Sequence, residues 1–103
     1  AADWFFYDDR FPRARRLATD LSGSTGLTPV QGDITGIWNA GLRRACGRSM
    51  LALHGVTTES FHFCLKILVG EQTRMQTRVT RLDQDLFLWQ IRCGQPINQS
   101  VIA

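Results

Sequence analysis

The stretch that most constrains the fold lies in the middle of the chain, at residues 49–65. Its apolar run, 50–53, shows no polar alternation, and such a run is typical of a strand that is covered on both faces of a parallel sheet. Gly55 then permits a sharp turn, and Thr57 or Thr58 is placed to cap the helix that follows. The stretch therefore predicts half of a β-α-β unit.

The rest of the chain continues this alternation of strands and helices. The order β-α-β-α-β-α-β-β predicts an α/β sandwich with a mainly parallel sheet, right-handed crossovers and a C-terminal antiparallel hairpin. We expect a flavodoxin-like or half-Rossmann arrangement with strand order 2-1-3 for the first three strands, and a ferredoxin-like α+β fold is the alternative. The expected strands are 3–7, 27–31, 50–53, 73–80 and 86–91, and the expected helices are 10–21, 34–47 and 58–70.

Two of these strands are expected at edges of the sheet. Pro29 cannot donate a hydrogen bond to a neighbouring strand, so the strand at residues 27–31 is expected either to lie at an edge or to begin just after Pro29. Residues 73–80 alternate and carry arginines, threonines and a glutamine, a composition typical of an exposed edge strand. Residues 1–93 are expected to form one domain, and residues 94–103 a tail.

The composition is that of a globular chain, with 44% hydrophobic and 20% charged residues among 103. No apolar run approaches the roughly 20 residues that span a bilayer, so no membrane span is expected. The net charge of +3 is small and scattered, and no basic run is interleaved with aromatic residues. We therefore expect no nucleic-acid partner.

The third predicted helix, 58–70, is apolar on nearly all sides. Only Glu59, His62 and Lys66 form a narrow polar stripe. A helix of this kind is covered either by the chain's own tail or by another subunit, and we expect a larger protein subunit or a homo-oligomer. The residues assigned to this interface are apolar or aromatic: Phe61, Phe63, Ile67, Leu68, Phe87 and Trp89.

A second candidate site lies where the parallel strands end. Ligands bind beyond the carboxyl ends of such strands, and the side chains available there suit acid/base chemistry or a metal held by the three carboxylates. The same carboxylates and hydroxyls also stand where helices need caps, and the histidine is equally a hydrogen-bonded structural residue. The candidate residues are Asp8, Asp9, Asp33, His54 and Thr57.

Known catalytic motifs are missing from the sequence. The first predicted strand is followed by Tyr7-Asp8-Asp9-Arg10-Phe11 and not by G-x-G-x-x-G, and no G-x-S-x-G or zinc-protease histidine pair occurs. A receiver phosphoacceptor is also missing, because His54 stands near the end of the third strand. An enzyme is therefore less expected than a non-catalytic protein, and no cofactor is assigned.

The three cysteines form no C-x-x-C pair. Cys64 stands among apolar residues and is expected to be a small buried hydrophobe. Cys46 and Cys93 stand near element ends and are able to pair in an oxidising compartment if the fold brings them together. A thiol redox function is the least supported hypothesis, since neither has a neighbouring second cysteine.

Three segments of the chain resemble small uncharacterised bacterial proteins that are made with twin-arginine export leaders. They are 6–11, Gly32-Asp33-Ile34-Thr35 leading to Trp38, and 53–58 leading to Phe63-Cys64-Leu65. The resemblance implies export to the periplasm in a folded state and association with a cofactor-bearing enzyme. The start at Ala1-Ala2 fits signal cleavage after a small residue, and equally a trimmed chain from the cytoplasm.

The sequence thus favours a non-catalytic accessory or interaction subunit of a larger bacterial assembly, an exported oxidoreductase being one such assembly. The alternative is a small enzyme or ligand-binding domain that uses the crevice at the carboxyl ends of the parallel strands.

Overall fold

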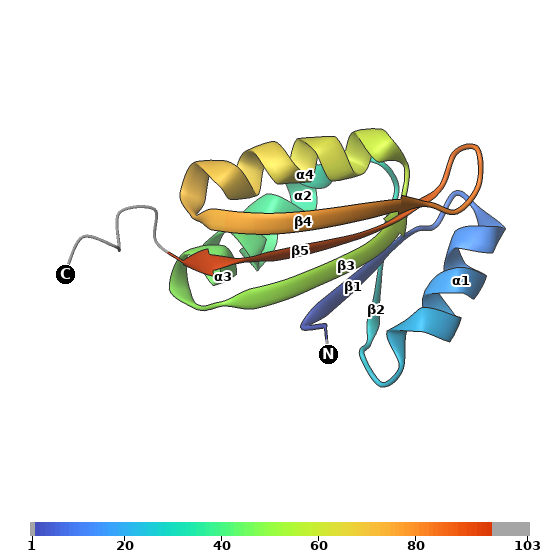
Figure 1. Ribbon diagram of the computed structural model, residues 1–103, viewed down its shortest axis with the longest axis horizontal. Coiled ribbons are helices and arrows are strands. Elements are labelled where there is room, and N and C mark those ends of the chain that lie inside the picture. The colour runs from blue at the N-terminus through green and yellow to red at the C-terminus, as the bar shows by residue number, and fades with distance from the viewer. Residues whose placement is uncertain (1, 96–103) are drawn as a thin grey trace.

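The computed structural model describes residues 2–95 and has an α/β architecture built on one five-stranded sheet (Figure 1). The strands stand in the order β2-β1-β3-β5-β4, so the predicted order 2-1-3 of the first three strands is confirmed. Along the chain the elements are β1 (Trp4–Asp8), α1 (Pro12–Ser22), β2 (Leu27–Val30), α2 (Ile34–Ile37), the π-helical turn η1 (Trp38–Leu42), α3 (Arg43–Arg48), β3 (Leu51–Thr57), α4 (Glu59–Gln72), β4 (Arg74–Arg81) and β5 (Phe87–Gln95).

The sheet is mixed, and the prediction of a mainly parallel sheet is wrong. β1 pairs in parallel with β2 and with β3, over four residues each. β5 pairs antiparallel with β3 over seven residues and with β4 over eight, so most of the pairing is antiparallel. The reason is that β5, the second strand of the predicted hairpin, lies beside β3 and pairs with it along the whole length of β3.

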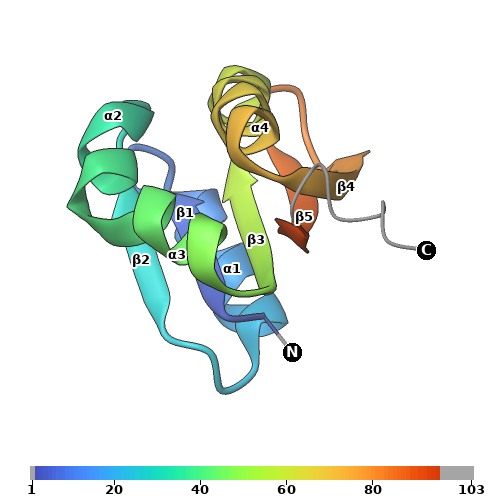
Figure 2. The ribbon, with the colours of Figure 1, turned by 90° about the vertical axis from the view of Figure 1, so that its left-hand side faces the viewer.

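Helices cover the sheet unequally on its two faces. On one face α2, η1, α3 and α4 pack over a core that includes Phe6, Leu53, Leu65 and Trp89. On the other face α1 packs on β1, β2 and β3, over a smaller core built around Phe5. Figure 2 shows α2 and α4 on one side of the sheet and α1 on the other. β1 lies inside the sheet between these cores, with Phe6 in the larger core and Phe5 in the smaller one.

The predicted helix caps are confirmed at two of three helices. Asp33 Oδ1 accepts from the Thr35 backbone N–H at the start of α2, at 2.9 Å. Thr58 Oγ1 accepts from the Phe61 backbone N–H at the start of α4. The prediction that Asp8 and Asp9 cap α1 is wrong, because the N-cap of α1 is Phe11, which makes no side-chain cap bond. Pro12 stands in the first turn of α1, where its missing N–H costs little.

Strand β3 continues to Thr57, so the sharp turn predicted at Gly55 is wrong. The glycine lies inside the strand because the indole of Trp89 occupies the space above it. A Cβ atom at residue 55 would lie 2.3 Å from Trp89 Cζ2, and glycine in a strand commonly marks such a close approach.

Helix α4 differs from the expectation in three respects. His62 is buried and does not belong to an exposed polar stripe. Cys64 is exposed, so its prediction as a buried hydrophobe is wrong. The helix also continues past Gly70 to Gln72 and ends at Thr73. These differences arise because His62 finds partners on β4 and β5, which turns the next residues toward solvent.

Two further expectations concern the carboxyl end and the membrane. Gly94 and Gln95 belong to β5, and the rest of the predicted tail, residues 96–103, lies outside the described residues. Within residues 2–95 no helix is both long and apolar enough to cross a membrane.

Candidate functional site

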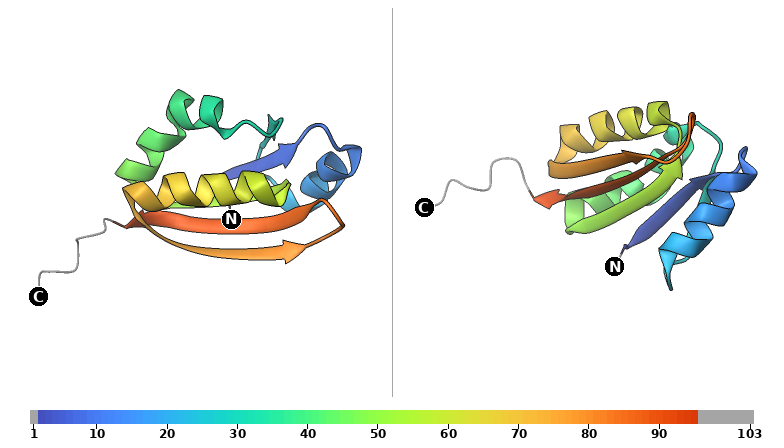
Figure 3. Two further views of the ribbon diagram at one scale, coloured as in Figure 1. Left: turned by 90° about the horizontal axis from the view of Figure 1, so that it is seen from above. Right: turned by 45° about the vertical axis from the view of Figure 1, so that its right-hand side comes forward.

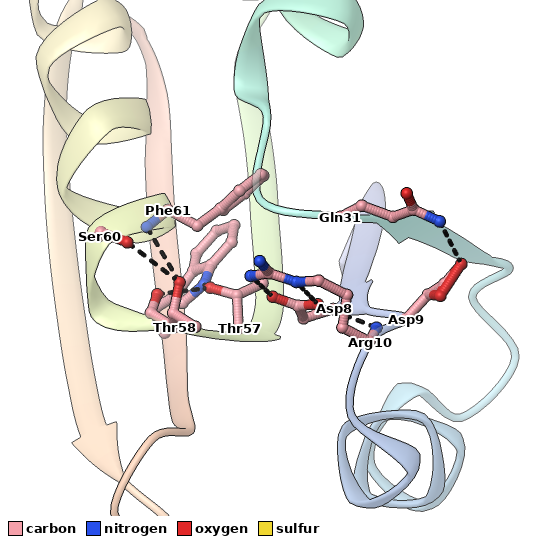
Figure 4. A network of polar contacts seen from close by, with 9 residues as sticks. Asp8, Asp9, Arg10, Gln31, Thr57, Thr58, Ser60 and Phe61 are labelled. Atoms are coloured by element: carbon pink, nitrogen blue, oxygen red, sulfur yellow. Dashed lines mark hydrogen bonds and ion pairs between the residues drawn. The ribbon is translucent and has the colours of Figure 1, made fainter.

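The carboxyl end of β1 is built around a buried carboxylate and one arginine. Asp8 is fully buried, and its Oδ1 accepts from the Arg10 backbone N–H at 3.1 Å and from Arg10 Nε at 3.0 Å. Arg10 Nη2 donates to Asp8 Oδ2 at 2.7 Å, so the side chains form a bidentate ion pair (Figure 4). This pairing raises the pKa of the Arg10 guanidinium, through the hydrogen bond first and the charge second.

The neighbouring carboxylates have separate partners. Asp9 Oδ2 accepts from Gln31 Nε2 at 3.3 Å, across the ends of β1 and β2. Asp33 is engaged in the cap of α2. Gly32 has a φ of 99°, and a Cβ atom there would lie 3.0 Å from Arg10 Nη2. The glycine therefore leaves space for the guanidinium, and the three carboxylates are held apart from one another.

Thr57, at the carboxyl end of β3, is engaged in the core. Its Oγ1 donates to the Thr58 backbone carbonyl at 2.9 Å and accepts from Trp89 Nε1 at 2.8 Å. Figure 4 shows Thr57 and Thr58 at the same end of the sheet as Asp8 and Arg10. Thr57 is fully buried, so this hydroxyl is not available to a substrate.

His54 stands three residues before the end of β3 and is not part of the crevice. It is half-buried, and its ring meets Phe5 edge-on at 5.7 Å between centroids. The pKa of His54 is lowered, first by burial and further by the positive charge of Arg92. His54 therefore lies on the sheet face that carries α1, away from Asp8, Asp9 and Asp33.

The crevice that remains is an open pocket of about 540 Å³ beside the start of α4. Arg10 and Arg81 contribute positive charge to it, and Glu59 and Asp85 contribute negative charge. Asp8, Asp9 and Asp33 do not line this pocket, and Asp8 is paired with Arg10. Among residues 2–95 no three His, Cys, Asp or Glu side chains are grouped to hold a metal, so the metal reading of Asp8, Asp9 and Asp33 is wrong.

The residues assigned to a partner interface divide into two groups. Phe61 and Trp89 are buried in the core, and Leu68 and Phe87 are partly buried. Phe63 and Ile67 are 55% and 48% exposed, and they stand one turn apart on the outer side of α4. The ammonium of Lys66 lies 5.9 Å from the centroid of the Phe63 ring. Phe63, Cys64 and Ile67 thus form an exposed apolar strip, which we call the α4 strip.

Strand β4 forms the free edge of the sheet next to α4. It is the last strand in the order, and every residue of it except the partly buried Met75 is exposed. Figure 3 shows β4 as the outermost strand, with no described element beyond it. Val79 is 50% exposed on this strand. The edge therefore presents outward-facing backbone groups between residues 75 and 81.

The hairpin of β4 and β5 carries positive charge on the face opposite α4. Gln90 lies opposite Arg78, and Arg92 lies opposite Gln76, so the two arginines are diagonal neighbours on one face. Both arginines are exposed. The strand sequences RMQTRVTR and FLWQIRCGQ contain no Asp or Glu. Sequence analysis found the edge but missed this basic face, which the absence of carboxylates from both strands would have indicated.

A short hydrogen-bonded chain joins α4 to this hairpin. Thr77 Oγ1 donates to the Gln90 backbone carbonyl at 3.0 Å, so His62 Nε2 donates its proton to Thr77 Oγ1 at 2.9 Å. The His62 ring stacks on Trp89 at 5.5 Å between centroids. Burial lowers the pKa of His62, with Lys66 as the second cause. His62 is thus a hydrogen-bonded structural residue whose neutral form is favoured by burial.

Comparison with protein-family models, with curated proteins and with solved structures finds no match to this chain.

Proposed function

We propose that this chain is a non-catalytic interaction subunit that binds an acidic, extended segment of a larger protein along the edge of β4. The observation that carries the proposal is the outer edge of β4 between residues 75 and 81, which has Phe63, Ile67 and Val79 on the α4 side of the sheet and Arg78 and Arg92 on the other side. An extended segment that adds to such an edge gains backbone hydrogen bonds along its length.

Charge supports the choice of partner. Arg78 and Arg92 stand close together on one face of the hairpin, and neither strand supplies a carboxylate to neutralise them. Acidic side chains on one face of an added strand would lie beside these guanidinium groups, which are suited to paired hydrogen bonds with carboxylates. A positively charged segment would be repelled at the same place, so the charge also gives selectivity.

The α4 strip supports the apolar side of the interface. Phe63 and Ile67 lie on the side of the sheet that carries Val79 of β4, and all three are about half exposed. Residues on one face of an added strand would contact β4 side chains, while a neighbouring helix or loop of the same partner would cover the α4 strip. Aromatic and aliphatic groups of this kind supply most of the binding free energy at protein interfaces.

The partner class and the compartment belong to the same proposal. The resemblance to proteins with twin-arginine leaders favours a larger subunit of an exported bacterial oxidoreductase, met in the periplasm. The parallel half, β2-β1-β3 with its crossover helices, keeps a flavodoxin-like arrangement in this proposal and acts as a scaffold. No reaction is assigned to its crevice, because Asp8 and Thr57 are engaged in internal hydrogen bonds.

The test uses a photo-crosslinking amino acid at three exposed positions of the full chain in its source organism. We expect position 79 on β4 and position 63 on α4 to crosslink to one larger protein, and mass spectrometry to place the position 79 crosslink in an acidic segment. Leu21 is 49% exposed on α1, on the other side of the sheet, and it serves as the matched control.

Charge and apolar variants complete the test. Arg78→Glu and the double variant Phe63→Asp/Ile67→Asp are expected to abolish recovery of the crosslinked partner, whereas Leu21→Asp retains it. A chain that crosslinks only to a second copy of itself, or equally from position 21, would contradict the proposal.

A further inference from the structure

The structure brings together two cysteines that lie 47 positions apart in the sequence. Cys46 belongs to α3 and Cys93 to β5, and their Sγ atoms are 3.7 Å apart. Both side chains lie in the larger core, where they are 0% and 5% exposed. Cys64, the remaining cysteine, is exposed on α4.

We propose that Cys46 and Cys93 form an intramolecular disulfide bond that ties α3 to β5 when the folded protein meets a disulfide oxidant. The bond requires the sulfur atoms to close from 3.7 Å to about 2.05 Å. Such a change is within reach of a small side-chain rotation and shift, because both residues already belong to one packed cluster. The inference is independent of the proposed interaction at β4.

The backbone around Cys93 supports this closeness. Gly94 has a φ of 118°, and a Cβ atom there would lie 2.4 Å from the Ser49 carbonyl oxygen. Only a glycine permits the end of β5 to approach the segment that follows α3 so closely. Cys93 directly precedes Gly94 in β5. Cys46 lies in α3, which ends at Arg48, directly before Ser49. The approach therefore holds the end of β5 against the segment that follows α3, and α3 and β5 are in contact.

An oxidant has a route to this pair. Cys93 lines an open pocket of about 570 Å³, together with Ala52, Met75, Gln76 and Arg92. Cys46 lies behind it and has no exposed surface. A small disulfide such as oxidised glutathione can therefore meet Cys93 first, while Cys46 remains protected.

The chemistry is thiol–disulfide exchange in two steps. Cys93 Sγ attacks one sulfur of oxidised glutathione, whose S–S bond breaks and releases one glutathione thiol. Cys46 Sγ then attacks Cys93 Sγ, forming the Cys46–Cys93 bond and expelling the second glutathione thiol. The protein loses two electrons and two protons, and the two released thiols carry both away.

The electrostatics of the pair favour the second attack, by Cys46, over the first, by Cys93. A hydrogen bond from Cys93 lowers the pKa of Cys46, which favours its thiolate for the second attack. The same hydrogen bond, together with burial, raises the pKa of Cys93. Cys93 therefore needs to pass its proton to a Cys46 thiolate during the first attack. That proton then protonates the second released glutathione as Cys46 reacts, and the proton that Cys46 had already released protonates the first.

Tryptic mapping of the full chain tests the proposal. Arginine and lysine place the three cysteines in different peptides, 45–48, 49–66 and 93–103. After equilibration of the folded protein with oxidised glutathione and alkylation of the remaining thiols, we expect peptide 45–48 linked to peptide 93–103. Cys64 is expected as the alkylated or glutathione-bound form. Oxidation in denaturant is the control, because there all three pairings compete.

Thermal unfolding gives the second readout. The oxidised Cys64→Ser variant is expected to melt roughly 10 °C or more above the same variant after reduction, since the bond closes a long loop. Alkylation of both Cys46 and Cys93 in the folded protein at equilibrium would overturn the proposal. So would a Cys46–Cys93 bond that leaves the melting temperature unchanged or lowers it.

Discussion

The indole of Trp89 on β5 donates a 2.8 Å hydrogen bond to the hydroxyl of Thr57 at the end of β3, and both side chains are fully buried. The Thr57 hydroxyl in turn donates a hydrogen bond to the Thr58 carbonyl, directly before α4 begins. One hydroxyl thus joins the antiparallel half of the sheet to the start of the longest helix. Its loss would leave a buried N–H group without a partner.

Thr57→Val keeps the shape of the side chain and removes this hydroxyl. We expect it to lower the free energy of unfolding by about 1–3 kcal/mol, which is the cost of an unsatisfied buried donor. Urea unfolding followed by tryptophan fluorescence measures the change. Thr80→Val, on exposed β4, is the matched control and is expected to stay within about 0.5 kcal/mol of the parent. Equal stability of the two variants would contradict the assignment.

Gly55→Ala is expected to destabilise the protein by about 3 kcal/mol or more, because the new Cβ atom would overlap Trp89 Cζ2 and force the indole to move. Gly36→Ala is the control, since α2 has open space at that position. It is expected to gain about 0.5–1 kcal/mol from the higher helix propensity of alanine. Denaturant midpoints compare the two, and an unchanged midpoint for Gly55→Ala would show that the strand does not approach the indole closely.

Stability is expected to fall as the pH decreases from about 7 to 5.5. The pKa of His62 is lowered in the folded protein, first by burial, so the unfolded chain binds the proton more readily. The stabilisation is complete above the unfolded pKa of about 6.5 and is lost as the pH falls toward the lower folded value. His54, whose pKa is also lowered by burial, contributes in the same direction.

The measurement is the urea midpoint at several pH values between 5.5 and 7.5. His62→Gln is expected to flatten this profile, because glutamine does not titrate and can still donate a hydrogen bond to Thr77. A profile with the same slope in the variant would mean that His62 is not the group responsible.

The ion pair of Asp8 and Arg10 is expected to behave asymmetrically. Arg10→Met leaves a fully buried carboxylate without its guanidinium, whereas Asp8→Asn keeps the shape and leaves only a half-exposed guanidinium behind. We therefore expect Arg10→Met to destabilise more than Asp8→Asn, and the double variant to recover part of the loss. Arg13→Met, which breaks the exposed pair with Asp83, is expected to change the denaturant midpoint little. The reverse order of Arg10→Met and Asp8→Asn would contradict the burial of Asp8.

The order of elements was predictable because each carries a local signal. Asp33 and Thr58 are caps that act within three residues, and Pro29 restricts β2 to an edge. The insertion of β5 beside β3 was not predictable, because it depends on contacts between segments far apart in the chain. Gly55 shows the difference: its local preference predicts a turn, and the distant Trp89 makes it a position inside a strand.

The sites were less predictable than the fold. Helix α4 is apolar around most of its circumference, so its sequence does not determine which face is buried, and His62 turns inward because Thr77 and Trp89 provide partners. Asp8 looks like a helix cap by position, but Arg10 competes for the carboxylate two residues later. The outcome of such competition depends on the geometry of the side chains in the folded chain, and it leaves no periodic pattern in the sequence from which it could be predicted.

The position of β5 also determines when the sheet can form during synthesis of the chain. β3 and β4 are made before β5, yet each pairs with β5 and not with the other. Until residues 87–95 leave the ribosome, β3 has an open edge, β4 has no strand to join, and the floor of the core beneath α4 lacks Trp89 and Ile91. The nascent chain therefore exposes apolar surface and two unpaired strands at once, a state in which chains associate readily. Folding of this sheet becomes cooperative only when its last strand enters the middle.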